Sequence, residues 1–239
     1  MQWTDFPIFD SLNFPSEFEA IDTIAGILLV NKPLGWTSFD VVKYVRSRIQ
    51  RKKVGHAGTL DPMADGLLVL CFGKATKSID QIQSQTKEYI AQIKFGASTP
   101  SYDAETEVDE VADCKHINLQ DIQQVLLDHF NGEIQQIPPM YSALKRDGKK
   151  LYELARKGKT IELESRPVHI YSSHIHSFKD DILELTISCS KGTYIRSIAH
   201  DLGIALGSRA HLCGLKRSKI GDFKAEKAIE INVFDSLIK

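Results

Sequence analysis

The sequence has few cysteines, and the four that it has stand far apart. They are Cys71, Cys114, Cys189 and Cys213. Common zinc sites need closely spaced cysteine or histidine ligands, and we expect no metal here. The same scattering argues against a disulfide framework, so reduced thiols in a cytoplasmic setting fit best. His174 and His176 share a face of a strand-like stretch, and without a second ligand pair we interpret them as surface histidines.

Long apolar runs are also missing. None approaches the roughly 20 residues that cross a membrane, and the N-terminus lacks the basic start and apolar core of a secretory signal. Six apolar residues separate Gly66 from Gly73, where a phosphate-binding loop needs four between its glycines. We therefore expect no membrane association and no nucleotide or other cofactor.

The net charge is only −1, which argues against nucleic-acid binding by bulk charge alone. The charges are nevertheless segregated. Six basic residues and no acid lie between Lys43 and Lys53, and seven basic residues against two acids lie between Lys145 and Lys159. Each cluster is explained equally well by a solvated helix surface or by a basic face on a nearly neutral protein.

The length of 239 residues fits one large domain or two small ones, with 42% hydrophobic and 26% charged residues. Apolar or alternating runs predict strands at 26–31, 67–72, 87–96, 162–175 and 182–190. Helical spacing predicts helices near 38–49, 118–130 and 195–206. We therefore predict an α+β fold with a mixed, largely antiparallel sheet and helices packed on it.

Two of these helices have recognisable N-caps. Either Thr37 or Ser38 can cap the first. In this helix Phe39, Val42, Val45 and Ile49 recur at helical spacing, so we expect them to point inward and leave Lys43, Arg46 and Arg48 toward the outside. Asn118 can cap the second, which the Asn-Gly pair after Phe130 ends.

The stretch 54–66 is the most informative part of the chain. It holds three glycines, a histidine and two aspartates between a basic segment and an apolar run. Asp61 precedes Pro62, which favours an extended conformation and keeps the carboxylate out of a helix. A carboxylate on a glycine-flanked loop is well placed to meet a ligand. A lone Asp-Pro pair is more often a structural turn, so the assignment depends on the whole stretch.

This stretch, Gly55-His56-Ala57-Gly58-Thr59-Leu60-Asp61-Pro62-Met63-Ala64-Asp65-Gly66-Leu67-Leu68, resembles the motif G-H-x-G-T-L-D-P-x-A-x-G-x-L of the TruB-type tRNA pseudouridine-55 synthases. Further blocks resemble the family in order, from Gly26–Ser38 and Lys87-Glu88-Tyr89 through 138–158 and Gly192–Arg196 to 210–221. Asn31 stands where the family usually has aspartate, a position we interpret as structural. Residues 99–105 match T-D-T-x-D-x-x-G only in part.

The resemblance implies an isomerase that converts uridine 55 in the T-loop of tRNA to pseudouridine. It implies a nucleophile, Asp61, and an arginine partner, Arg196, which would favour the ionised carboxylate. A tyrosine such as Tyr89 is usually a core residue, but the resemblance places it on the extruded uracil. The implied remaining substrate contacts are His56 near the opening, and Tyr194 and Leu215 in the uridine pocket.

The resemblance also implies a domain plan. A catalytic domain of the pseudouridine synthase fold would span 26–239 after an N-terminal extension at 1–25. An insertion at about 131–160 would clasp the RNA, with phosphate contacts from Lys145, Arg146, Lys149 and Lys150. Eighteen residues follow Gly221, so we expect a short form without the C-terminal PUA domain of many relatives. We expect the T-arm of tRNA as partner, a monomer, and no obligate protein partner.

Several alternatives stay open at this stage. The chain is either an enzyme or an RNA-binding module that helps tRNA to fold, and replacing Asp61 by Asn separates the two. A third option is pseudouridylation of another RNA, as in the guide-directed enzymes of rRNA. The residues do not decide whether Asp61 attacks the uracil ring or the ribose.

Overall fold

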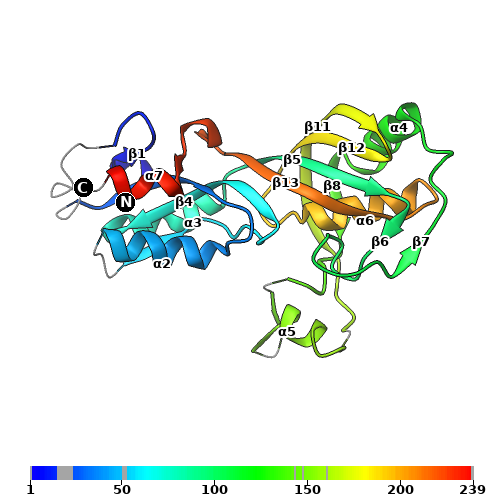
Figure 1. Cartoon of the computed structure of the whole chain (residues 1–239), viewed down its shortest axis with the longest axis horizontal. Helices are drawn as coiled ribbons and strands as arrows, with labels where there is room; N and C mark the ends of the chain where they lie inside the picture. Colours follow the sequence, from blue (N-terminus) through cyan, green and yellow to red (C-terminus); the bar gives the residue numbers. More distant parts are fainter. Residues whose placement is uncertain are drawn as a thin grey trace. The chain divides into compact units, whose positions relative to one another are not determined.

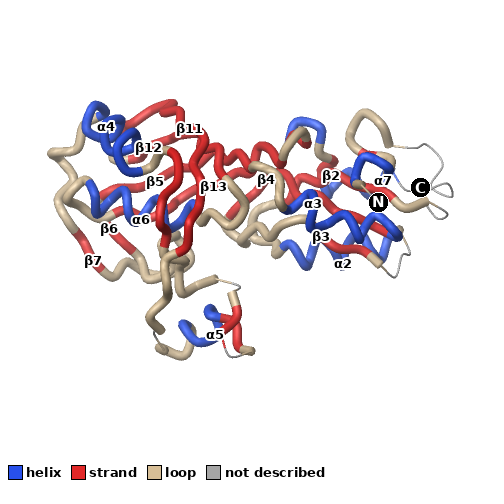
Figure 2. Tube along the Cα trace, turned by 180° about the vertical axis from the view of Figure 1, so that it is seen from behind, coloured by secondary structure: helices blue, strands red, loops and turns tan. Residues whose placement is uncertain are grey.

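The chain divides, by contacts between its residues, into two compact units. The first consists of Met1–Tyr89 with Lys216–Lys239, and the second of Ile90–Leu215. Two strands, β5 (Lys87–Phe95) and β13 (Ala210–Ile220), contain the points of division (Figures 1 and 2). The computed structural model describes residues 2–14, 24–49, 53–142, 144–146, 148–159 and 161–237.

The first unit is built around one strand pair. Its elements are η1 (Trp3–Asp5), β1 (Ile8–Phe9), β2 (Gly26–Lys32), α2 (Ser38–Arg48), β3 (Val54–His56), β4 (Ala64–Phe72), η2 (Gly73–Ser78), α3 (Ile79–Gln83), β14 (Phe223–Lys224), η3 (Ala225–Lys227), β15 (Ile229–Glu230) and α7 (Ile231–Leu237). β2 and β4 pair antiparallel from Gly26 opposite Phe72 to Lys32 opposite Gly66. β3 joins the other edge of β4, also antiparallel.

The outer edge of β2 is covered by both ends of the chain. β1 pairs in parallel beside Ile27 and Leu28, and β15 pairs in parallel beside Val30 and Asn31. Asn31 also donates a side-chain hydrogen bond of 2.6 Å to Glu230, so its position is structural, as predicted. An open edge strand invites pairing with other chains, and these short segments occupy it.

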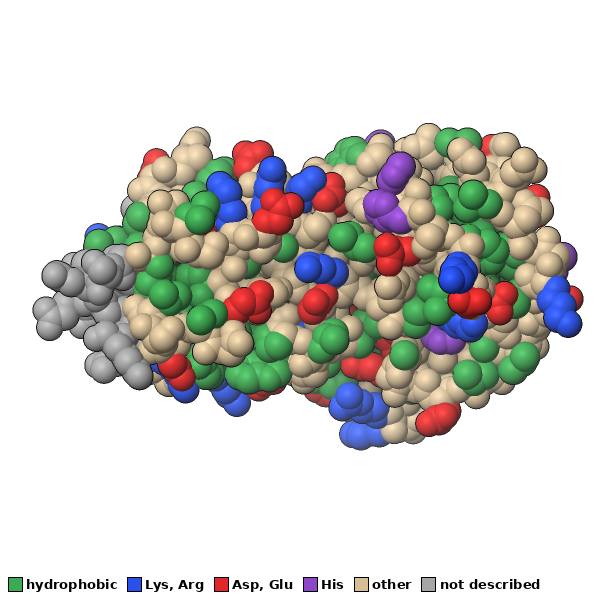
Figure 3. Space-filling model, turned by 45° about the horizontal axis from the view of Figure 1, so that its top comes forward, with side chains coloured by type: hydrophobic (Ala, Val, Ile, Leu, Met, Phe, Trp, Pro, Cys, Tyr) green, Lys and Arg blue, Asp and Glu red, His purple; other side chains and the backbone are tan. Residues whose placement is uncertain are grey.

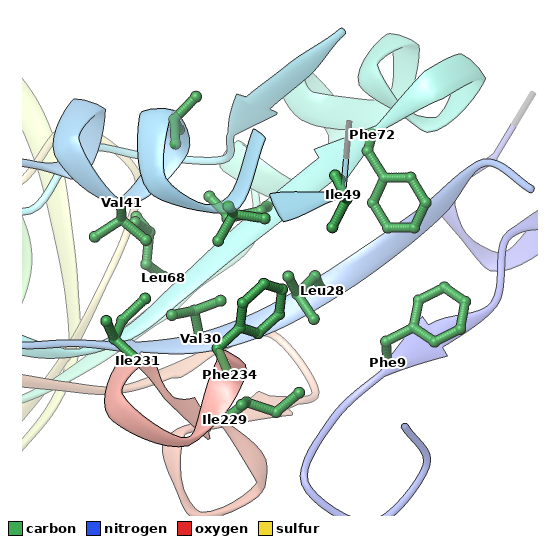
Figure 4. Packing of buried hydrophobic residues seen from close by; sticks show 13 residues of the cluster. Phe9, Leu28, Val30, Val41, Ile49, Leu68, Phe72, Ile229, Ile231 and Phe234 are labelled. Atoms are coloured by element: carbon green, nitrogen blue, oxygen red, sulfur yellow. The ribbon is translucent and has the colours of Figure 1, made fainter. Parts of the chain in front are cut away.

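Both faces of this strand pair are buried, which explains the uninterrupted apolar runs of β2 and β4. On one face, Leu28, Val30 and Leu68 pack with side chains of α2 and α7 (Figure 4). The opposite face is covered by a second apolar cluster that includes Ala57 and Phe223. The predicted strands at 26–31 and 67–72 are confirmed.

Helix α2 resolves one open alternative and corrects one expectation. Thr37 is the N-cap, and it forms a capping box with Asp40. Val41, Val42 and Val45 face the core, whereas Phe39 is 55% exposed. The prediction that Phe39 points inward is therefore wrong, because the apolar stripe of the helix runs through position 41.

The second unit has a sheet in the order β5-β12-β11-β8. Its further elements are β6 (Ala97–Ser98), β7 (Glu110–Val111), α4 (Leu119–His129), β8 (Gly132–Gln136), β9 (Lys145–Arg146), β10 (Lys149–Lys150), α5 (Leu151–Ala155), β11 (Arg166–Lys179), β12 (Ile182–Cys189) and α6 (Ile195–Ala205). β11 pairs antiparallel with both β12 and β8. β11 begins at Arg166, four residues later than predicted, because Arg166 pairs with Gln136, the last residue of β8.

One face of this second sheet is buried and the other is not. Burial alternates along β12, and Leu183, Leu185 and Ile187 point inward. α4 packs against β11 and α6, and its predicted N-cap Asn118 accepts bonds from two backbone amides. His174 and His176 are exposed with their rings 5.1 Å apart, as predicted. In both units the sheet is mixed or antiparallel with helices packed on it, so the predicted α+β class is confirmed.

Two parts of the expected domain plan, the N-terminal extension and the insertion, can be located in the structure. Residues 2–14 of the predicted extension pack within the first unit, where Trp3 lies 5.0 Å from Phe223 between ring centroids. In the second unit, β9, β10 and α5 form a small subdomain at the predicted insertion (Figure 1). Within the described ranges, no helix combines the length and the apolar character that crossing a membrane requires.

Candidate active site

The loop that carries Asp61 connects β3 to β4 and is held mainly through its backbone. The Ala57 amide donates to Val69 at 2.8 Å, and Gly35 donates to the carbonyl of Pro62 at 2.8 Å. The buried hydroxyl of Ser38 bonds both the amide and the carbonyl of Leu60, at 2.8 and 3.1 Å. These hydrogen bonds anchor the loop, and Asp61 within it is half-buried.

A buried arginine fixes the same loop from β13. Arg217 is 1% exposed and donates hydrogen bonds to the carbonyls of Gly58, Thr59 and Leu67, at 2.8 to 3.2 Å. Gly66 has a φ of +100°, and a Cβ there would lie 2.5 Å from the carbonyl oxygen of Arg217. Only glycine permits both this backbone angle and this close approach. Arg217 therefore sets the path of the loop on both sides of Asp61.

A second buried cation, Lys32, lies at the end of β2. Its ammonium group donates to the carbonyls of Pro33 and Trp36, at 2.9 and 2.7 Å. Burial lowers the pKa of Lys32 to about 8, although the carboxylates of Asp65 and Asp61 act in the opposite direction. This attraction is mutual, so a protonated Lys32 favours the ionised form of Asp61 that a nucleophile needs.

The other predicted site residues of the first unit are His56 and Tyr89. Burial, and to a smaller degree the charge of Arg217, lowers the pKa of His56 below its usual range. The imidazole is therefore neutral at pH 7 and suited to contact a neutral base. Tyr89 is half-buried in β5.

In the second unit, Arg196 lies in the first turn of α6 and forms a buried ion pair. Its Nη1 is 3.0 Å from Oδ2 of Asp103, and the side chains are 4% and 0% exposed. The carboxylate of Asp103 also accepts bonds from the Ser101 hydroxyl and the Glu105 amide, at 2.6 and 2.9 Å. A buried pair is stable only with such supporting hydrogen bonds. Asp103 thus orients the guanidinium of Arg196.

Tyr194 and Leu215 complete the predicted pocket residues. The backbone of Tyr194 is held by Gln136, which accepts from its amide at 2.8 Å and donates to its carbonyl at 3.0 Å. The guanidinium of Arg166 lies 4.9 Å from the centroid of the Tyr194 ring. Leu215 is half-buried in β13.

The predicted site residues are thus distributed over the two units. The first unit contains His56, Asp61 and Tyr89, and the second contains Tyr194, Arg196 and Leu215. The pairing of Asp61 with Arg196 joins residues of different units and stays a prediction. Sequence reasoning missed Lys32, Asp103 and Arg217, although each lies in a block that resembles the family.

The structure describes only some residues of the two basic clusters, 43–53 and 145–159. The backbone of the predicted phosphate contacts forms the antiparallel β9–β10 pair, while their side chains lie outside the described residues. In the other cluster, Lys43 and Arg46 are exposed on α2, Arg48 pairs with Asp235 at 2.9 Å, and 51–52 are not among the described residues. On the face in Figure 3, basic and acidic side chains are interspersed.

The next feature is the arrangement of cysteines and other side chains that can bind metals. The cysteines are thiols, and burial raises the pKa of Cys71 to about 12. In the described part of the chain, no group of three or more His, Cys, Asp or Glu residues is placed to hold a metal ion.

Comparison with known proteins adds a family and a set of relatives. Residues 46–195 match the model of the TruB family pseudouridylate synthases (N-terminal domain). The tRNA pseudouridine synthase B of Parabacteroides distasonis is 48% identical over 226 residues, which cover 92% of this chain and 96% of that protein. The enzyme of the same name from Flavobacterium johnsoniae is 46% identical over 220 residues, covering 89% and 96%.

Solved structures show the same fold. A Cbf5-Nop10-Gar1 complex contains a chain that is 28% identical, with a TM-score of 0.69, covering 95% of this chain and 59% of its own. An H/ACA RNP bound to a substrate RNA containing 2'-deoxyuridine gives 26% identity and a TM-score of 0.67, covering 92% and 56%. The chain therefore spans somewhat more than half the length of these two structures.

Proposed function

Since the chain belongs to the TruB family of pseudouridylate synthases, we propose that it converts uridine 55 in the T-loop of tRNA to pseudouridine, with Asp61 as the nucleophile. Membership makes it an isomerase, and its relatives are named for tRNA as substrate. The observation that carries the proposal furthest is the anchored loop around Asp61. Ser38 and Arg217 hold this loop, and the charge of Lys32 favours the carboxylate.

The reaction breaks the glycosidic bond between N1 of uracil and C1′ of the ribose and forms a bond between C5 and C1′. A proton leaves C5, and N1 gains one, so product and substrate contain the same atoms. Asp61 forms a transient covalent bond either to the uracil ring or to the ribose, and this bond is broken when the product is released. Because a stacked base is out of reach, the target base must first swing out of its stack in the T-loop.

The other residues bind and orient the substrate. Tyr89 stacks on the extruded uracil, Tyr194 and Leu215 line the pocket, and neutral His56 contacts the RNA at the opening. Arg196, oriented by Asp103, is the partner of the Asp61 carboxylate. Basic side chains of the insertion at about 131–160 bind phosphates of the T-arm, which gives affinity without reading sequence.

The test is to incubate the purified chain with an unmodified tRNA transcript and to map pseudouridine along it by reverse transcription after carbodiimide treatment. We expect one modified site, at position 55, and no reaction with a transcript that carries cytidine there. Because only this chain is present, the same result supports action without a different protein as partner. Pseudouridine at another position, or none, would contradict the proposal.

A further inference from the structure

The turn at 192–194, which leads into α6, is held by two residues that face each other across neighbouring strands of the second sheet. Gln136 is the last residue of β8, Arg166 is the first residue of β11, and the two are antiparallel partners. Residues 137–165, which include most of the predicted insertion, lie between them in the sequence. We call this pair the Gln136–Arg166 rung.

The first member of the rung, Gln136, fixes the backbone of the turn. Its side-chain amide accepts a bond from the Tyr194 N–H at 2.8 Å and donates one to the Tyr194 carbonyl at 3.0 Å. The carbonyl of the next residue, Ile137, accepts a bond of 2.8 Å from the hydroxyl of Ser197 in the first turn of α6. These bonds attach the backbone around Arg196 to the end of β8.

The second member, Arg166, restrains the side chain of Tyr194. Its Nη2 donates to the carbonyl of Gly192, and its guanidinium lies over the Tyr194 ring, 4.9 Å from the centroid. Arginine stacks on aromatic faces through its planar, delocalised cation. Because the bond to Gly192 holds the guanidinium in place, the ring is restrained from one face.

We propose that Arg166 is a positioning residue for the reaction, which holds the Tyr194 ring in the orientation in which it lines the uridine pocket. This inference rests on the proposed function and deepens it. Because the guanidinium occupies one face of the ring, a bound uridine meets the opposite face or the edge. Arg166 thus acts through Tyr194.

The exposure of the two side chains explains why such a restraint matters. Tyr194 and Arg166 are both half-buried, so packing alone does not enclose the ring. A side chain without a restraint samples several staggered rotamers, of which only some would line the pocket. Catalysis depends on substrate contacts held in the productive geometry, so a ring that leaves this orientation slows the reaction.

The structure offers a matched control for this contact. On α2 of the first unit, the guanidinium of Arg48 lies over the Tyr44 ring, 3.7 Å from the centroid. Neither of these two residues is assigned to the site. Arg48→Met therefore removes the same kind of contact elsewhere in the chain.

The experiment is a double-mutant cycle on the single-turnover rate. An unmodified T-arm stem-loop is mixed with protein in saturating excess, so that the rate reports on the bound complex and not on affinity. Arg166→Met and Arg166→Gln both remove the cation, so the test does not depend on the folding of one variant, and Arg166→Lys retains it. Each is combined with Tyr194→Leu, which removes the ring, and with Tyr194→Phe, which removes only the hydroxyl group.

We expect Arg166→Met and Arg166→Gln to slow pseudouridine formation about five- to thirtyfold, the effect of losing one cation–π contact. Arg166→Lys should stay within about twofold of the unaltered protein, because a cation remains over the ring. The slowing should persist in the Tyr194→Phe background. In the Tyr194→Leu background it should fall below about twofold, because no ring is left to position. Arg48→Met should behave like the unaltered protein.

The inference is overturned if the variants without the cation turn over like the unaltered protein. It is also overturned if they are slowed equally with and without the Tyr194 ring, which a purely structural role predicts, or if Arg166→Lys is as slow as Arg166→Met. Failure of the proposed function is a different result. The unaltered protein then forms no pseudouridine, or Tyr194→Leu alone leaves the rate unchanged.

Discussion

At the scale of single residues, the loop of Asp61 depends on two buried cations with different roles. Arg217 is bonded to backbone carbonyls and determines where the loop runs. Lys32 is bonded to carbonyls of its own loop and acts on Asp61 and Asp65 through its charge. Shape and charge at this site therefore come from different side chains, and they can be tested separately.

Replacing Arg217 with Met should destabilise the protein by about 2–4 kcal/mol, because three carbonyls lose their donor in a buried place. It should also slow pseudouridine formation more than tenfold, since the loop is released on both sides of Asp61. Denaturant unfolding and single-turnover rates measure the two effects. The exposed neighbour Lys216, changed to Met, is the control and should stay within 0.5 kcal/mol, roughly the range of surface substitutions. Equal behaviour of the two variants would refute this role of Arg217.

Lys32 predicts a particular dependence of stability on pH. The pKa of Lys32 is about 8 in the folded chain, and in the unfolded chain it takes the ordinary value of 10.5. Between pH 8 and pH 10.5 the unfolded state therefore binds more protons than the folded state. Stability therefore rises as pH increases from about 8 to 10.5, by up to about 3 kcal/mol from this group. In the Lys32→Met variant this contribution should vanish, while Lys43→Met on exposed α2 should retain it. Parallel pH profiles for all three proteins would show that Lys32 is not perturbed.

At the scale of elements, the strands and helices with a clear pattern were predictable from residues alone. β2 and β4 carry uninterrupted apolar runs because both of their faces are buried. Asn118 caps α4 as predicted. The exposure of Phe39 and the late start of β11 were not predictable, because both depend on which partner covers the element, and a single sequence does not contain that information.

Because β1 covers part of the outer edge of β2, the N-terminal segment should contribute to stability. Residues 1–14 supply β1, whose Phe9 is 7% exposed and lies 5.7 Å from Phe72 between ring centroids. Deleting 1–14 should lower stability by at least about 3 kcal/mol, the usual cost of losing one buried phenylalanine. It should also promote self-association through the opened strand edge. Urea unfolding and light scattering measure these effects. Unchanged stability would mean that these residues are dispensable for the fold.

At the scale of the whole molecule, the fold class and the motif residues were accessible from the sequence, and the supporting groups were not. Asp61 and Arg196 stand in blocks that resemble a family, so their identity was predicted. Asp103 lies in the one block that matches only in part, and it became visible through its buried contact with Arg196. A cavity of about 560 Å³ in the second unit brings together three segments distant in sequence, which no local pattern indicates.

The proposed catalytic residues are distributed over the two units. The proposed nucleophile belongs to one unit, and its proposed partner belongs to the other. Each unit holds its own proposed group through a buried contact, Arg217 at the loop of Asp61 in the first unit and Asp103 at Arg196 in the second.

The most direct test of the central claim is the turnover of Asp61→Asn on an unmodified T-arm stem-loop, with Asp65→Asn as control. Asparagine keeps the size of the side chain and removes the nucleophilic oxygen. We predict that Asp61→Asn binds the RNA within a few-fold of the unaltered protein and forms no pseudouridine. Asp65 interacts electrostatically with the same Lys32, which makes it a matched control. Because Asp65 is not the proposed nucleophile, Asp65→Asn should retain turnover. Pseudouridine formed by Asp61→Asn at a rate comparable to the unaltered protein would contradict the assignment of the nucleophile.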